Sequence, residues 1–221
     1  MMQYTHNYMK IFLDTAETDV IRKYFQTGLV DGVTTNPTLI MKSGRDPEEV
    51  YQEIKDIGIR DISMEVIGTD TEMYDEGLRL YEKFGDVATI KVPCTREGLN
   101  VCRHLSSKNI KTNVTLIFSA AQAVLAAKAG ATYVSPFVGR IDDQGYSGLE
   151  VVRSIAGLYK TTGFSTQVLA ASIRTPHRAV RSYYNGADVV TMPSPVFWQM
   201  FEHVLTESGL RQFEVDYETF N

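Results

Sequence analysis

The stretch VATIKVPCTREGLNVCRHLSSKNIKTNVT, Val87–Thr115, decides the fold class of this 221-residue chain. It opens with an apolar run, passes through a segment of helical periodicity at Arg96–Ser107, and returns to a second strand-like run at Lys111–Thr115. Apolar runs with little polar alternation are typical of parallel strands whose two faces are both covered. The stretch therefore predicts one strand–helix–strand unit.

The same alternation extends to both ends of the chain. The predicted strands are Lys10–Leu13, Gly32–Thr35, Ile62–Val66, Val87–Val92, Lys111–Thr115, Thr132–Ser135, Gln167–Ala171 and Asp188–Met192. The predicted helices are Thr18–Gln26, Asp46–Ile57, Thr71–Phe84, Arg96–Ser107, Ala120–Ala129, Gly148–Thr161, Thr175–Tyr184 and a last one that opens at Ser194. Eight such units take about 27 residues each, which predicts an α/β fold of the TIM (β/α)8 barrel type. A doubly wound open sheet is the alternative, but no G-x-G-x-x-G follows the first strand.

No linker rich in proline, glycine or serine interrupts this alternation. We therefore expect a single domain over residues 1–221, with an N-terminal extension at residues 1–9. After the eighth helix, residues 206–221 form a surplus amphipathic and aromatic segment. This extra C-terminal helix is expected to be either a cap on the barrel or an arm onto a neighbouring subunit.

The composition excludes several classes of protein. A hydrophobic fraction of 43% excludes disorder, and 27 acidic against 22 basic residues (net charge −5) argue against a nucleic-acid partner. No apolar run approaches the roughly 18 residues of a membrane span, and the first residues do not resemble a signal peptide. Two cysteines without a CxxC motif are typical of a reducing cytoplasm. The four histidines lack ligand spacing, so no metal site is expected.

Functional side chains of a barrel lie at the carboxyl ends of its strands, where the loops converge. In strand order, the residues at these positions are Asp14, Thr34, Thr35, Asn36, Glu65, Lys91, Asn113, Thr115, Ser135, Phe137, Arg140, Ser172 and Arg174. Nearly every strand contributes a polar or charged residue at the same end. That shared position is a stronger signal than any single residue.

Lys91, within ATIKVP, carries the clearest chemical prediction. A lysine is costly to bury in its charged form, and a neutral amine can attack a ketone to form a Schiff base. The alternative is that the Lys91 side chain extends from the strand end into solvent. Asp14 and Glu65 on other strand ends favour chemistry, because a Schiff-base reaction must move protons. Asp14 could instead cap the following helix, whereas a buried Glu65 needs a partner, and Lys91 on the adjacent strand is the natural one.

Arg140 and Arg174, with Ser172, form a second group. Guanidinium groups and a hydroxyl suit a phosphate monoester, which they can hold through forked hydrogen bonds. Either arginine could instead pair with Asp142 or Asp143 nearby. The group therefore suggests a phosphate at the barrel mouth, less strongly than the lysine suggests catalysis.

Six segments resemble the transaldolase family, in its short form, which also includes fructose-6-phosphate aldolases. They are, in order, FLDTA, GVTTNPTLI, TIKVPCTREGL, TNVTLIFSAAQA, SPFVGRIDD and AASIRTP, and the resemblance covers about Lys10 to Pro193. It implies a TIM barrel without metal or cofactor, a Schiff base at Lys91, sugar-phosphate substrates and a place in the pentose phosphate pathway of carbohydrate metabolism. It also implies a homo-oligomer, a pentamer or decamer with exchanged C-terminal helices.

The resemblance also suggests roles for single residues. Asp14 would be the acid and base of carbon–carbon cleavage, and Glu65 and Thr115 would hold the catalytic water. Asn36, Asn113 and Ser135 would bind the hydroxyls of the donor sugar, and Arg140, Ser172 and Arg174 would hold its phosphate. Thr34 and Phe137 are also predicted to bind substrate.

Two positions separate the transaldolases from the fructose-6-phosphate aldolases within this family. The aldolases that this sequence resembles carry Gln at the position of Glu65 and Tyr at that of Phe137, and Arg174 also matches the transaldolases better. The sequence therefore predicts a transaldolase, which transfers a dihydroxyacetone unit from a ketose phosphate to an aldose phosphate. A fructose-6-phosphate aldolase that releases dihydroxyacetone is the alternative. A non-catalytic sugar-phosphate binder is the third, and it would gain nothing from a costly buried lysine.

Overall fold

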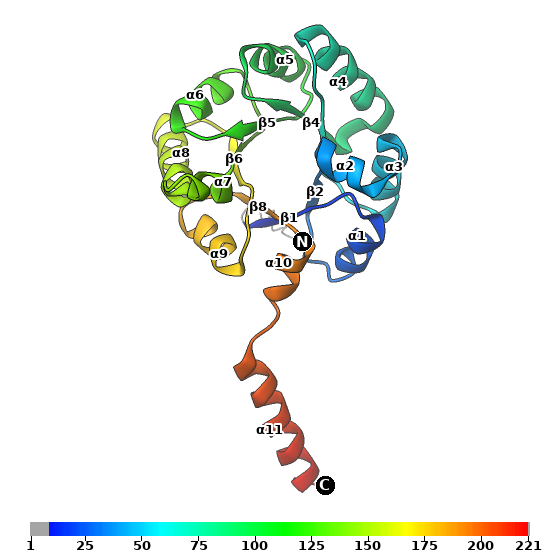
Figure 1. Cartoon of the computed structure of the whole chain (residues 1–221), viewed down its shortest axis with the longest axis vertical. Helices are drawn as coiled ribbons and strands as arrows, with labels where there is room; N and C mark the ends of the chain where they lie inside the picture. The colour runs from blue at the N-terminus through cyan, green and yellow to red at the C-terminus, as the bar shows by residue number, and fades with distance from the viewer. Residues whose placement is uncertain (1–8, 221) are drawn as a thin grey trace, which may run out of the picture.

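A computed structural model describes residues 9–220, so the N-terminal extension lies outside the described residues except for Met9. Eight parallel strands close into a barrel in chain order, with helices around it (Figure 1), as the sequence predicts. The strands are β1 (Lys10–Asp14), β2 (Gly32–Thr34), β3 (Ile62–Glu65), β4 (Ala88–Pro93), β5 (Thr112–Ile117), β6 (Tyr133–Pro136), β7 (Gln167–Ala170) and β8 (Val189–Met192).

The predicted helices are all present, and two more follow β2 and β6. The helices are α1 (Thr18–Phe25), α2 (Pro37–Ser43), α3 (Pro47–Ile57), α4 (Asp70–Phe84), α5 (Arg96–Ser106), α6 (Ala120–Lys128), α7 (Val138–Asp143), α8 (Gly148–Thr162), α9 (Pro176–Tyr184), α10 (Ser194–Gln199) and α11 (Val204–Phe220), with a 3-10 turn at Gly85–Val87. Helix α2 begins after Asn36, whose side-chain oxygen accepts from Leu39 N (3.0 Å). The short α2 and α7 are absent from the sequence prediction.

Side chains of the strands contribute to two hydrophobic cores, one on each face of the barrel sheet. The larger core lies between the barrel and its helices, and a smaller cluster comprises Phe12, Tyr133, Leu169, Ala171 and Val189. The rings of Phe12 and Tyr133 meet edge to face at 6.1 Å although β1 and β6 are not neighbours, so this contact crosses the barrel interior. The inside of the barrel is therefore filled, as in other TIM barrels.

A cluster of hydrogen bonds around Asp61 lies at the amino-terminal end of the barrel. The carboxylate of Asp61 accepts from Thr89 Oγ1 (2.7 Å), Tyr133 OH (3.0 Å) and Lys111 Nζ (3.1 Å). These bonds tie β3, β4, β5 and β6 together at their starts.

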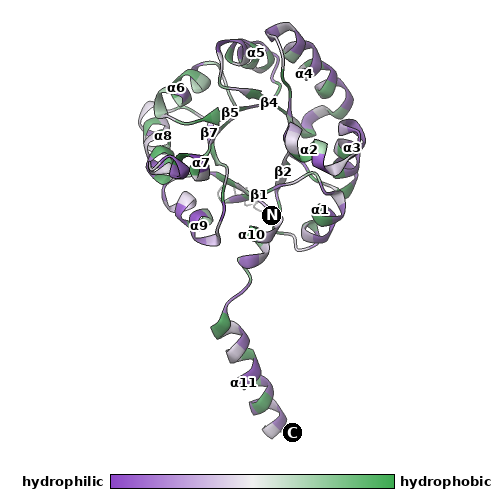
Figure 2. Ribbon diagram, viewed as in Figure 1, coloured by the Kyte–Doolittle hydropathy of each residue, from purple (hydrophilic) through white to green (hydrophobic). Residues whose placement is uncertain are grey.

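Helix α11 projects away from its own barrel and alternates apolar and polar residues (Figures 1 and 2). None of its described residues is buried; Phe213 is 69% and Phe220 93% exposed. It therefore caps neither end of the barrel in this chain. Among residues 9–220, the structure has no helix that is both long and apolar enough to cross a membrane.

Candidate active site

A pocket opens at the carboxyl ends of the strands, and we call it the barrel-mouth pocket. Ten of the twelve residues that were predicted to have a catalytic or binding role line it: Asp14, Thr34, Asn36, Lys91, Asn113, Thr115, Ser135, Phe137, Arg140 and Ser172. Ala171 and Thr191 complete the lining. The two remaining predicted residues, Glu65 and Arg174, lie beside this pocket rather than in its wall.

Strand register places Lys91 between two polar neighbours. Glu65 pairs with Lys91 across β3 and β4, and Lys91 pairs with Asn113 across β4 and β5. Lys91 Nζ lies 2.9 Å from Glu65 Oε2 and donates to the carbonyl oxygen of Thr35 (2.7 Å). Lys91 is only 5% exposed, so the alternative of a lysine that extends into solvent is wrong.

The ion pair explains how the barrel tolerates this buried ammonium group. A buried charge is stable when it is paired and hydrogen-bonded, and Glu65 and the Thr35 carbonyl supply both interactions. The same carboxylate is within reach to take a proton from Nζ. The arrangement can therefore convert an ammonium group into a nucleophilic amine without a solvent molecule.

Asp14 is bonded inside the pocket. Its Oδ1 accepts from Thr34 Oγ1 (2.8 Å), which also lies 2.7 Å from Thr191 Oγ1. Burial raises the pKa of Asp14; the Thr34 bond and the charges of Lys91 and Arg140 oppose this increase, and the charge of Glu65 adds to it. The N-cap of α1 is Glu17, so the alternative of Asp14 as a helix cap is wrong. A carboxyl group with a raised pKa in a pocket suits an acid–base role.

This raised pKa predicts that Asp14→Asn makes the protein more stable at neutral pH. Folding favours the protonated carboxyl, so stability falls as the pH rises from the unfolded pKa to the folded one. Asparagine removes the buried charge and keeps an acceptor for Thr34, so we expect a gain on the order of 1 kcal/mol at pH 7. Urea unfolding at pH 7 and pH 4 checks this. The gain should shrink at pH 4, and a variant less stable than the parent at pH 7 would contradict the assignment.

Asn113 and Thr115 occupy the same face of β5. Asn113 accepts from Ser135 Oγ (2.7 Å) and donates to Ser63 Oγ (3.2 Å), so the protein itself fixes this amide. Thr115 Oγ1 is buried and has no hydrogen-bond partner within residues 9–220. The strand is irregular just beyond it, where Leu116 adopts a φ of 58°. The Thr115 hydroxyl is therefore available to a molecule in the pocket.

Phe137, at the end of β6, forms an aromatic wall. Its ring lies 5.9 Å from that of Phe118, and the Arg140 guanidinium lies over it at 4.8 Å.

Ser172 has a φ of 57°, which is a strained conformation for a residue other than glycine. A Cβ atom at position 139 would lie 2.4 Å from the carbonyl oxygen of Ser172. Close approach of the two loops thus requires glycine at position 139.

Arg174 forms an ion pair with Asp143, which is the alternative to phosphate binding that the sequence left open. Both of its terminal nitrogens donate to the carboxylate of Asp143, and its side chain is 54% exposed. The pair lies beside the pocket, so Arg140 is the arginine directly in the pocket wall.

The sequence prediction missed two features of the site. Thr191 is the one polar residue of the strand VVTM, and that polarity inside a buried strand could have identified it. The Thr35 carbonyl, which accepts from Lys91, leaves no trace in the sequence because any residue has one.

Comparisons with known proteins give the family of this chain. Residues 11–220 match the family model described as Transaldolase/Fructose-6-phosphate aldolase. A "Probable transaldolase" of Caulobacter vibrioides (strain NA1000 / CB15N) is 50% identical over 210 residues, covering 95% of this chain and 96% of the relative. A "Probable transaldolase" of Lactiplantibacillus plantarum is 46% identical over 212 residues, covering 96% and 98%.

A solved structure supports the fold alone. The thiamine phosphate pyrophosphorylase from Pyrococcus furiosus superposes with a TM-score of 0.58 at 18% identity, covering 85% of this chain and 87% of the other. The family match and the two relatives span nearly the whole chain, so this chain belongs to the transaldolase/fructose-6-phosphate aldolase family.

Proposed function

We propose that the chain is a transaldolase that moves a dihydroxyacetone unit between sugar phosphates through a Schiff base at Lys91. The observation that carries this proposal is the buried Lys91–Glu65 pair, 2.9 Å apart, beside a pocket that also holds Asp14. The donor would be a ketose phosphate such as fructose 6-phosphate or sedoheptulose 7-phosphate. A non-catalytic binder would have no use for this costly arrangement.

The residues of the pocket support a sequence of steps. The Lys91 ammonium passes a proton to Glu65, and the amine attacks the ketone carbon to give a carbinolamine, which loses water. Thr115, with its available hydroxyl, helps to hold that water. Asp14 takes the proton from the hydroxyl beta to the imine, the carbon–carbon bond breaks, and an aldose phosphate leaves. The three-carbon enamine then adds to a second aldose phosphate, whose carbonyl oxygen takes the proton from Asp14, and hydrolysis frees Lys91.

A coupled assay tests the proposed function. With fructose 6-phosphate alone, we expect glyceraldehyde 3-phosphate to appear only in the amount of one equivalent per site, because the enamine stays bound. Adding erythrose 4-phosphate as acceptor should start steady turnover. Continuous release of dihydroxyacetone without acceptor would make the chain a fructose-6-phosphate aldolase, and no reaction in either case would support a binder.

The position of Arg140 predicts an effect confined to phosphorylated substrates. One charge-assisted bond is worth about 1.5–3 kcal/mol, so Arg140→Ala should raise KM for fructose 6-phosphate about 10- to 100-fold. Arg174→Ala should raise it less, since that guanidinium is engaged by Asp143. Unphosphorylated fructose is the control substrate, and its kcat/KM should not change in Arg140→Ala. Equal losses for both substrates would contradict a phosphate role.

The chain is also proposed to form a homo-oligomer through α11, a pentamer or decamer by family resemblance. Helix α11 leaves large apolar side chains uncovered, including Leu205 (70% exposed) and Phe213 (69%). Uncovered apolar surface of this kind is typical of an interface. Sedimentation of the full chain should give an oligomer, and a truncation that ends at Phe201 should sediment as a smaller species; a monomeric full chain would refute the proposal.

A further inference from the structure

A second pocket lies behind the lysine, and Glu65 contributes to its lining. It opens between α2, α3 and α4, has a volume of about 400 Å³, and includes Ile40 and Met41 of α2, Tyr51 of α3 and Leu80 of α4. We call it the back pocket. Glu65 thus contacts Lys91 on one side and the back pocket on the other.

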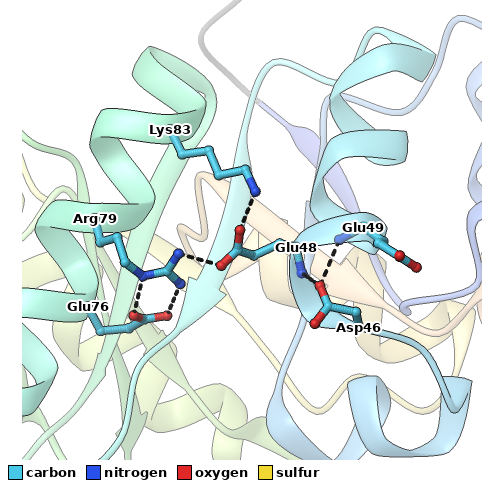
Figure 3. Close-up of polar contacts among 6 residues, drawn as sticks. All are labelled: Asp46, Glu48, Glu49, Glu76, Arg79 and Lys83. Carbon is cyan, nitrogen blue, oxygen red and sulfur yellow. Dashed lines mark hydrogen bonds and ion pairs between the residues drawn. The ribbon is translucent and has the colours of Figure 1, made fainter.

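Charged side chains line the back pocket, and several of them form the ion pairs that Figure 3 shows. Arg79 on α4 binds Glu76 on its own helix and Glu48 on α3, and Lys83 also binds Glu48. Asp46, Glu48, Glu76 and Arg79 all line the pocket. The ion pairs hold α3 against α4 while keeping the entrance polar. A space of this size with polar groups at both ends can hold many water molecules.

A bound substrate would block the barrel-mouth pocket but not the back pocket. The barrel-mouth pocket has a volume of about 100 Å³, so a sugar phosphate would fill it and block solvent from that side. Lys91, with its side chain 7% exposed, is deeper than Glu65, at 13%. Glu65 therefore keeps a contact with solvent that does not depend on the mouth.

We propose that the back pocket is the route by which water and protons exchange between the Lys91 site and bulk solvent while substrate occupies the mouth. This inference rests on the proposed function. Each Schiff base formed expels the ketone oxygen as one water molecule, and each hydrolysis consumes one. Glu65 takes one proton from the ammonium group and gives it to the carbinolamine hydroxyl, which leaves as that water while the iminium ion forms. Hydrolysis reverses these transfers, so atoms and charges balance over the cycle. Met41, 73% exposed on α2, borders this route.

Oxygen labelling during transfer tests the route. The reaction runs in ¹⁸O-water with saturating donor and erythrose 4-phosphate, and mass spectrometry counts label at the carbonyl of the new ketose. Enzyme-free samples correct for spontaneous exchange. If expelled water escapes through the back pocket, the parent should add nearly one solvent oxygen per product molecule. If water is trapped, the product keeps the donor's oxygen.

Met41→Trp fills the back pocket from an exposed position and should lower solvent oxygen per product at least about twofold, with KM for the donor unchanged. Lys42→Trp, on the same helix and also exposed, and Met41→Ala should both match the parent. Full label in Met41→Trp, an equal loss in Lys42→Trp, or retained donor oxygen in the parent would each overturn the route. Absence of any transfer by the parent would instead refute the proposed function.

Discussion

Replacing Lys91 with methionine should abolish transfer and the borohydride trapping of dihydroxyacetone on the protein. Methionine has a similar length and no nitrogen, so no Schiff base can form, and we expect kcat to fall by at least about 10⁴-fold. The measurement is the mass of the intact protein after incubation with fructose 6-phosphate and borohydride. Trapped adduct that persists in Lys91→Met would place the Schiff base on another lysine.

Two further variants make this test specific. Lys91→Met leaves Glu65 without its partner, and loss of one member of a buried pair costs roughly 3–5 kcal/mol, so Lys91→Met/Glu65→Gln provides a neutral site that should fold and remain inactive. Lys111→Met is the matched control. Lys111 also pairs with a carboxylate, Asp61 at 3.1 Å, but at the opposite end of the barrel, and this variant should still be trapped.

The barrel was predictable because its strands are covered on both faces. A run such as ATIKVP is mainly apolar because both of its faces are covered. It can therefore be recognised as a strand before any of its contacts is known. Strands that follow one another in the chain are also neighbours in the barrel, which is why the pairing of Glu65 with Lys91 could be anticipated from two strand ends. Local pattern and topology together predicted the centre of the site.

Contacts between distant segments were not predictable in this way. Helix α2 has seven residues, too few for a clear helical period, and it depends on the Asn36 cap and on packing with the barrel. Arg174 could face a phosphate or Asp143, and only the position of α7 decides between them. The back pocket has no signature in the sequence because it is the space left where α2, α3 and α4 meet β3.

Helix α2 lies between the two pockets. A chain that spends about 27 residues on each unit leaves little length for a lid, so short loops would be expected to exclude water from the site. Helix α2 forms a wall between two spaces: Asn36, its cap, lines the barrel-mouth pocket, and Met41, five residues on, lines the back pocket. A seven-residue helix can thus separate the two pockets without a long loop.

Phe137→Tyr should turn the protein toward an aldolase. Phe137 lines the barrel-mouth pocket, and its ring is held by Phe118 at 5.9 Å and by the Arg140 guanidinium at 4.8 Å, so tyrosine can occupy the same position. Its hydroxyl would supply a proton to the enamine, which phenylalanine cannot do. General acid catalysis is worth about 10²- to 10⁴-fold, so even partial alignment should raise dihydroxyacetone release without acceptor by roughly 100-fold.

Phe118→Tyr is the control for this prediction, because it adds the same hydroxyl to the neighbouring ring, which is 41% exposed and packs behind Phe137. The assay follows dihydroxyacetone release from fructose 6-phosphate with and without erythrose 4-phosphate. In Phe137→Tyr, release without acceptor should rise while transfer falls, since both reactions draw on the same enamine. Unchanged release in Phe137→Tyr, or an equal rise in Phe118→Tyr, would show that retention of the enamine does not depend on the missing hydroxyl at position 137.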